Sequence, residues 1–148
     1  MSVDLQWYLL RKNNAFIVKR VPEGPIFSKE PGNIKNIHSR KYSGLIGDQS
    51  LHIAHDGNGI SLTSRKPKSS LHDHGKGTHK STIRPRSGPR RAHGVVASQA
   101  RNGYRADLRT AALQRVTALI RAQQEKKAAP EKKLRGKKKA AATTTTTE

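Results

Sequence analysis

The residues of this chain that could do chemistry are mostly lysines and arginines, and they crowd into its second half. Residues 1–60 hold eight Lys or Arg against five Asp or Glu, whereas residues 61–148 hold 22 against five. An excess of this size repels itself unless a polyanion neutralises it, and phosphate backbones do so well because each contact releases a condensed counterion. The candidate RNA-binding residues are the bases between positions 61 and 124, namely Arg65, Lys66, Lys68, Lys76, Lys80, Arg84, Arg86, Arg90, Arg91, Arg101, Arg105, Arg109, Arg115 and Arg121.

The densest group of arginines lies in residues 82–93, TIRPRSGPRRAH. Pro85 and Pro89 favour extended backbone, so neighbouring arginines can line a groove without a recognition helix. The planar guanidinium pairs with phosphate and stacks on bases. RNA is favoured over DNA because the sequence has no Cys/His finger, no leucine heptad and no symmetric recognition helix.

Other side chains that could carry chemistry lack a supporting framework. His72, His74 and His79 surround Asp73, but the bases around them would repel a cation, and a ligand site needs a rigid support. Asp and Glu residues are scattered, no Ser/His/Asp set is visible, and there is no Cys. We therefore predict a non-enzyme with no metal, no cofactor and no small-molecule substrate.

Residues 1–64 are predicted to form a compact α+β head. A helix is expected over residues 2–12, with Ser2 as its N-cap, followed by short strands near 15–18 and 26–29. The clearest element is a hairpin, in which 51–55 and 60–63 alternate apolar and polar residues around a Gly- and Asn-containing turn. Leu51, Ile53, Ile60 and Leu62 should face one core, while His52, Ser61 and Thr63 point away.

Aromatic residues place the expected core at the front of the chain. Five of the six precede residue 60, so we predict that any sizeable core comes from roughly the first 65 residues, with Trp7 part of it. Residues 65–88 contain few large apolar side chains and cannot offset the entropy of ordering, about 1–2 kcal/mol per residue. They are predicted to be an extended basic arm.

Two basic helices are expected over residues 89–125. The first begins at Pro89 and stops at Asn102-Gly103, and the second spans about 105–124. Arg109 and Arg115 fall within or at the edge of the second helix's apolar face, which predicts that they contact RNA phosphate or bridge RNA and protein. Residues 126–148 read as a low-complexity, lysine-rich, disordered tail.

The fold class predicted is therefore α+β, with a small N-terminal antiparallel sheet and short helix, an extended basic arm, a C-terminal helix pair and a basic tail. No apolar run approaches the about 20 residues needed to span a bilayer, and the order of charges at the N-terminus is the reverse of a secretory signal. We expect no membrane partner.

Several stretches resemble the eukaryotic large-subunit ribosomal protein family twenty-eight, which is unrelated to the bacterial protein of that number. They are LQWYLLRKNNAFIVKR at 5–20, FSKEPGNI at 27–34, YSGLIG at 42–47, DGNGISL at 56–62 and YRADLRTAALQRVTALIRAQ at 104–123. The resemblance runs collinearly over roughly 2–124. It implies a structural constituent of the cytoplasmic large ribosomal subunit that contacts ribosomal RNA and neighbouring proteins, is not a homo-oligomer, and passes through the nucleus and nucleolus during assembly.

Two other functions remain open from the residues alone. A ribosome-assembly factor family shares a related head domain, although such factors are longer and carry acidic segments. A chromatin-type protein that condenses nucleic acid would suit the Lys/Ala/Pro tail, but Trp7 and the hairpin match a winged-helix head poorly. An RNA-modifying enzyme is the weakest option, because no convergent set of polar residues is visible.

Overall fold

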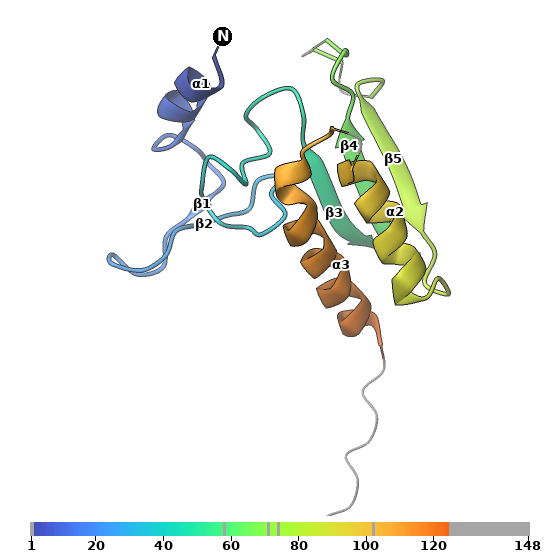
Figure 1. Ribbon diagram of the computed structural model, residues 1–148. Coiled ribbons are helices and arrows are strands. Elements are labelled where there is room, and N and C mark those ends of the chain that lie inside the picture. The colour runs from blue at the N-terminus through green and yellow to red at the C-terminus, as the bar shows by residue number, and fades with distance from the viewer. Residues whose placement is uncertain (1, 58, 71, 74, 102, 125–148) are drawn as a thin grey trace, which may run out of the picture.

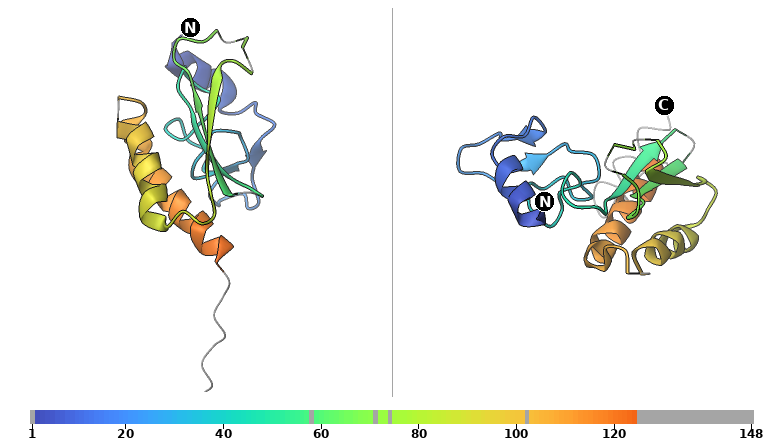
Figure 2. Two further views of the ribbon diagram at one scale, coloured as in Figure 1. Left: turned by 90° about the vertical axis from the view of Figure 1, so that its right-hand side faces the viewer. Right: turned by 90° about the horizontal axis from the view of Figure 1, so that it is seen from above.

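A three-stranded antiparallel sheet with two helices on one face forms the centre of the molecule (Figures 1 and 2). The structure is a computed structural model that describes residues 2–57, 59–70, 72–73, 75–101 and 103–124. Its elements are α1 (Val3–Leu10), β1 (Ile17–Val18), β2 (Phe27–Ser28), β3 (Leu51–Asp56), β4 (Gly59–Arg65), β5 (Thr78–Ile83), α2 (Pro89–Arg101), the 3₁₀ turn η1 (Ala106–Leu108) and α3 (Arg109–Gln123). The prediction of an α+β fold is confirmed.

The predicted hairpin is confirmed and forms β3 and β4. Ile53 pairs with Leu62 across the two strands, and Leu51, Ile53, Ile60 and Leu62 are all 2 % exposed or less. Successive side chains of a strand point to opposite faces, so these four share the face that the helices cover. Gly59 opens β4 with φ of 136°, and a Cβ there would lie 2.1 Å from the carbonyl oxygen of Ile83. The close approach of β5 to the turn therefore requires glycine.

The hydrophobic core is built by the sheet and both C-terminal helices together. Ala92 and Val96 of α2 and Ala112 and Val116 of α3 are at most 1 % exposed and pack against the strand residues. More than half of the core cluster lies after residue 65. The prediction that a sizeable core comes only from the first 65 residues is wrong, because small side chains in the helices let them approach the sheet closely.

The predicted extended arm over 65–88 is wrong for Thr78–Ile83, which form β5. This strand pairs with β4 along its whole length, with Lys80 opposite Thr63 and Ile83 opposite Ile60. Only Ile83 of its six side chains is buried. Backbone hydrogen bonds to β4 thus hold a segment that buries little apolar area. An edge strand that carries a lysine fits this place in a sheet.

The helix predictions hold with one refinement. The expected α2 begins at Pro89 as predicted and ends at Arg101. The second expected helix is divided, because Arg105 has positive φ (46°) and η1 precedes α3. Lys126–Lys139 and the rest of the predicted tail, residues 126–148, lie outside the described residues.

Residues 2–50 form an amino-terminal lobe beside the sheet, and buried polar groups hold it together (Figure 1). The Glu30 carboxylate is 4 % exposed; it accepts hydrogen bonds from the Asn33 side chain (2.8 Å) and the Ser43 hydroxyl (3.1 Å). Ile34 reaches into the main core. The predicted helix near the N-terminus is present as α1, and Ser2 caps it by accepting from the Leu5 amide (3.3 Å).

Trp7 is not a core residue, contrary to the prediction. Helix α1 has no buried side chain, and the half-buried Trp7 ring lies against the His38 imidazole with 5.0 Å between centroids. The core formed instead where small helix residues meet the sheet. An eight-residue helix at the edge of the molecule had no comparable apolar surface to cover.

Candidate nucleic-acid interface

The fourteen predicted RNA-binding residues occupy three kinds of environment. Ten are exposed, namely Lys66, Lys68, Lys76, Lys80, Arg84, Arg86, Arg90, Arg91, Arg109 and Arg121. Arg65, Arg105 and Arg115 are half-buried, and the side chain of Arg101 lies outside the described part of the chain. Most of the exposed side chains are free to meet a partner, although the Lys66 ammonium donates to the Lys76 carbonyl oxygen and Lys80 pairs with Asp56.

The amino end of α2 gathers the largest group of exposed bases. Arg84 and Arg86 lie in the five-residue connection between β5 and α2, and Arg90 and Arg91 lie in the first turn of α2. The connection turns back on itself, since the Ser87 amide donates to the Arg84 carbonyl at 2.9 Å. Arg84, Ser87 and Arg91 line a hollow of about 410 Å³ on this side of the molecule. The turn therefore brings bases from the strand end and from the first helical turn together.

This arrangement opposes the electrostatics of the helix itself. The amino end of a helix carries partial positive charge and free N–H groups, and acidic residues usually stabilise it. Here the first turn of α2 has no acidic residue, and it carries Arg90 and Arg91. The repulsion is relieved when an anion binds, because N–H groups and guanidinium groups then point at the same negative charge.

A second basic surface lies on the face of the sheet opposite the helices. His52, Thr63 and Lys80 are cross-strand neighbours there, and Arg65 follows two residues after Thr63. Arg65, His52 and Thr63 line a hollow of about 310 Å³ together with Asp73 and residues of the amino-terminal lobe. Lys80 also forms an ion pair with Asp56 at 2.7 Å, with both side chains at least half exposed. The residues placed here can donate several hydrogen bonds to one ligand.

His52 is held in a defined tautomer on this face of the sheet, where it is half-buried. Its Nδ1 accepts a hydrogen bond from the Gly32 amide at 3.1 Å, so in the neutral ring the proton is on Nε2. Burial lowers the pKa of His52 below its usual 6.5, and the positive charge of Arg115 lowers it further. Neutral His52 offers one N–H donor at neutral pH.

Arg109 and Arg115, which were expected to interrupt the apolar face of α3, differ in their exposure to solvent. Arg109 is exposed at the start of the helix, while Arg115 is half-buried and its Nε has no hydrogen-bond partner among the described residues. Arg115 is close enough to His52 to affect its titration. Their contact with RNA, or their bridging of RNA and protein, stays a prediction.

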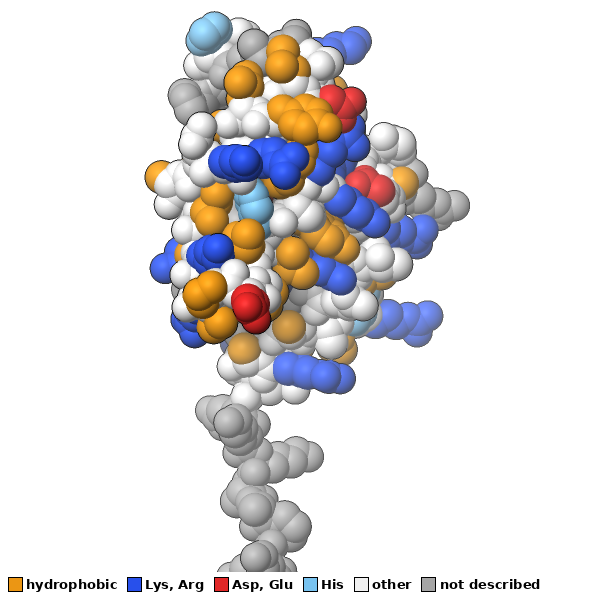
Figure 3. All heavy atoms as spheres, turned by 90° about the vertical axis from the view of Figure 1, so that its left-hand side faces the viewer, with side chains coloured by type: hydrophobic (Ala, Val, Ile, Leu, Met, Phe, Trp, Pro, Cys, Tyr) orange, Lys and Arg blue, Asp and Glu red, His pale blue; other side chains and the backbone are white. Residues whose placement is uncertain are grey.

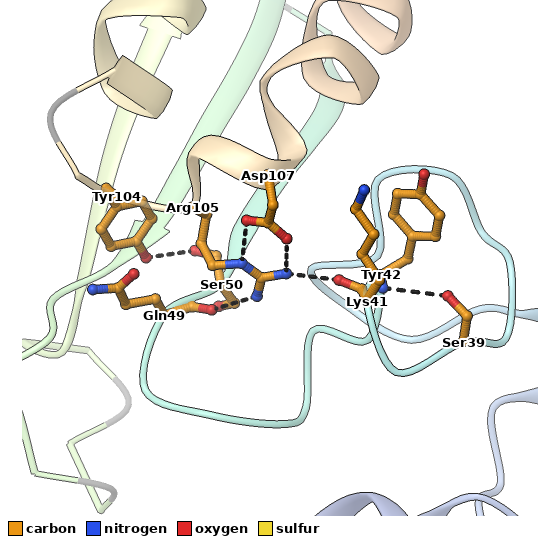
Figure 4. Close-up of polar contacts among 8 residues, drawn as sticks. All are labelled: Ser39, Lys41, Tyr42, Gln49, Ser50, Tyr104, Arg105 and Asp107. Carbon is orange, nitrogen blue, oxygen red and sulfur yellow. Dashed lines mark hydrogen bonds and ion pairs between the residues drawn. The ribbon is translucent and has the colours of Figure 1, made fainter. Parts of the chain in front are cut away.

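Arg105 is engaged within the protein (Figure 4). Its guanidinium donates to the carbonyl oxygens of Lys41 (2.6 Å) and Gln49 (3.0 Å) and pairs with Asp107 (3.1 Å). These contacts join the connection between α2 and α3 to the amino-terminal lobe. The positive φ of Arg105 belongs to the same turn. The geometry supports a structural role for a side chain that sequence alone placed among the RNA-binding candidates.

Tyr104 makes the neighbouring connection. Its hydroxyl lies 2.8 Å from the Ser50 carbonyl oxygen (Figure 4). It also lies 2.7 Å from the Arg65 carbonyl oxygen and accepts from the Arg65 amide at 3.0 Å. Burial raises the pKa of Tyr104 above 10, which keeps the hydroxyl protonated. Tyr104 thus holds the open end of the β3–β4 hairpin in place.

The sequence reasoning missed that Arg65 and Lys80 share one sheet face, because it did not predict β5. A signal was available: Thr78, Thr82 and Ile83 are β-branched within six residues. No group of three His, Asp or Glu side chains gathers as metal ligands among the described residues, which leave out His74 of the histidine segment. No helix in the described ranges is long and apolar enough to cross a membrane.

Comparison with protein families identifies the chain. Residues 5–122 match the ribosomal L28e protein family. The chain belongs to the ribosomal L28e protein family. The match covers the sheet, all the helices except the ends of α1 and α3, and every predicted RNA-binding residue. The predicted family resemblance is thereby confirmed.

Curated relatives of this L28e-family chain agree with the assignment. It is 30 % identical over 126 residues to the large ribosomal subunit protein eL28 of Schizosaccharomyces pombe, which covers 84 % of this chain and 94 % of that protein. It is 35 % identical over 118 residues to eL28 of Dictyostelium discoideum, covering 78 % of this chain and 84 % of that protein. The chain is a structural ribosomal protein and not an enzyme, as predicted.

Proposed function

We propose that this L28e-family protein serves in the large subunit of the eukaryotic cytoplasmic ribosome by clamping ribosomal RNA against the amino end of α2. Arg84, Arg86, Arg90 and Arg91 would bind phosphates of the RNA backbone. The observation that carries the proposal is the gathering of four exposed arginines where a helix normally carries acids. Passage through the nucleus and nucleolus before assembly belongs to the same proposal.

The face of the sheet opposite the helices extends this contact. Arg65 and Lys80 add charge, and Thr63 and the Nε2–H of His52 add neutral donors that suit phosphate or 2′-hydroxyl oxygens. Neighbouring ribosomal proteins would contact other surfaces of the molecule. Arg109 and Arg121, which are exposed on α3, are further candidates for phosphate contacts.

The salt dependence of binding tests the proposal. The triple variant Arg84→Ala, Arg86→Ala, Arg91→Ala and the wild type would be titrated with purified large-subunit RNA over a range of KCl concentrations. Each lost phosphate contact should reduce the slope of log K against log [salt] by about 0.7–0.9, so the variant should lose roughly 2–3. These side chains are exposed, and Arg91 opposes the dipole of α2, so the thermal unfolding midpoint should stay the same or rise slightly.

A charge-matched control separates the local contact from net charge. Lys19, Arg20 and Lys29 are also exposed and lie in the amino-terminal lobe. Their replacement by alanine also removes three positive charges, but it should leave most of the slope of log K against log [salt] unchanged. Equal slopes for the two triple variants would contradict binding at the amino end of α2.

A further inference from the structure

Exposed apolar side chains are concentrated in the amino-terminal lobe. Of eleven large hydrophobic residues that are exposed among the described residues, ten lie between Val3 and Leu45, and the other is Val95. Figure 3 views the molecule from the side of this lobe, where hydrophobic and basic side chains are interspersed with few acidic ones. Ile34 and Ile46 of the lobe are buried, whereas these ten residues remain at its surface.

Helix α1 carries the most regular part of this apolar surface, with three exposed side chains on one helix face. Leu5, Tyr8 and Leu9 are 48 %, 66 % and 57 % exposed. Their i, i+3, i+4 spacing puts them on one face of the helix. The inner face is fixed by other groups: the Gln6 side chain accepts from the Gly47 amide at 3.1 Å, and Trp7 lies against His38. The helix is therefore anchored with its apolar face directed outward.

The cost of this orientation points to a missing partner. An isolated helix of eight residues is marginal in water, and stability usually comes from packing an apolar face. Helix α1 buries no side chain in the protein, yet its outward face carries two leucines and a tyrosine. Exposed i, i+3, i+4 anchors of this kind are how a helix docks in a groove of another protein.

The charges at the rim of the face indicate the chemistry of the partner. Arg11 lies over the Tyr8 ring at 5.8 Å, and the exposed Lys12 follows it. The acid of the helix, Asp4, is already paired with Arg40. An apolar surface with positive charge at its edge complements an apolar groove edged by carboxylates.

We infer that Leu5, Tyr8 and Leu9 form a docking face for a neighbouring ribosomal protein that offers an apolar groove bordered by Asp or Glu. The inference rests on the proposed place of the chain in the large subunit. RNA is the poorer occupant, because two of the three anchors are aliphatic and have neither a ring for stacking on bases nor a donor for phosphate.

Retention on the ribosome tests the docking face. Cells would carry the wild type, Leu5→Ser/Leu9→Ser, or Val21→Ser/Ile26→Ser as sole copy, the last pair being exposed aliphatics off α1. Copies per purified large subunit would be counted after washes at low and high KCl. Loss of two leucines that the partner would cover should reduce retention of the first variant about tenfold at both salt concentrations, because apolar contacts are not screened by salt. Unchanged retention, or equal loss in the control pair, would overturn the inference.

The two proposals fail in distinguishable ways. The Arg84/Arg86/Arg91 alanine variant should come off only in the high-salt wash. Absence of the wild type from large subunits would refute the proposed function. If the Leu5→Ser/Leu9→Ser variant were retained like the wild type while the arginine variant was lost at high salt, the docking face alone would be refuted. Circular dichroism of the serine variant should give the wild-type unfolding midpoint, since neither leucine is buried.

A photocrosslinker identifies the occupant directly. With p-benzoylphenylalanine at Tyr8, assembled large subunits should give a crosslink to a ribosomal protein peptide that contains apolar residues and Asp or Glu. The same group at Val21 should not label that peptide. A crosslink from Tyr8 to ribosomal RNA, or none at all, would overturn the inference.

Discussion

Replacement of Tyr104 by phenylalanine should loosen the end of the sheet while leaving the ring in place. The hydroxyl donates to the carbonyls of Ser50 and Arg65, at 2.8 and 2.7 Å, and accepts from the Arg65 amide at 3.0 Å. A phenol has one proton, so it makes one good donated bond and one accepted bond at a time. The Arg65 amide also donates to the Ser50 carbonyl at 3.1 Å, so it keeps a partner in the variant.

The size of the effect follows from this count. Each net hydrogen bond contributes about 0.5–1.5 kcal/mol, and the surviving Arg65–Ser50 bond limits the penalty for an orphaned amide. We expect Tyr104→Phe to lower the free energy of unfolding by about 1–2 kcal/mol. In a domain of this size that lowers the thermal midpoint by roughly 3–10 °C.

Thermal and urea unfolding followed by circular dichroism would measure this change. Tyr8→Phe is the matched control, because it removes the same atom from a side chain that is 66 % exposed, and it should shift the midpoint by less than about 1 °C. If Tyr104→Phe and Tyr8→Phe unfolded at the same temperature as the wild type, the hydroxyl would not be holding the hairpin end, and the structural account of this junction would be refuted.

Two further predictions concern the titration of a histidine and the packing of a glycine. The pKa of His52 is lowered in the folded state, so the unfolded chain binds more protons below pH 6.5. Stability should therefore fall as the pH drops below 6.5, and His52→Gln should flatten this dependence in urea titrations at a series of pH values. A Cβ at Gly44 would lie 2.2 Å from the Pro31 carbonyl oxygen, so Gly44→Ala should lower the free energy of unfolding by about 1–3 kcal/mol or more in urea titrations. Gly57→Ala meets no atom within 4 Å and should change it by less than about 0.5 kcal/mol.

Elements whose signals are local were predictable from the sequence. The hairpin of β3 and β4 alternates over its whole length around a turn rich in glycine, and Pro89 marks the start of α2. Strand β5 was not predictable in the same way, because it buries only Ile83 and is held mainly by its pairing with β4. A segment stabilised by a distant partner strand carries little evidence of that partner in its own composition.

The same distinction applies to the candidate interface. Charge counting selected all fourteen bases equally, since a sequence gives the sign of a side chain but not its surroundings. The fold separates Arg105, which bonds the Lys41 and Gln49 carbonyls, from Arg84 and Arg91, which are exposed beside each other at the amino end of α2. No local pattern around Arg105 distinguishes it from the others.

The sequence by itself determined the chemistry of this protein: a basic, cysteine-free chain without a catalytic set, whose motifs are those of the ribosomal L28e family. These properties depend on residue type and short-range order, which the chain carries in any conformation. Only the tertiary structure decided which charges are free to bind, because that depends on which carbonyls and carboxylates the fold brings near each guanidinium. It also decided that Leu5, Tyr8 and Leu9 face outward, since Trp7 and Gln6 fix the opposite side of α1 to segments far along the chain.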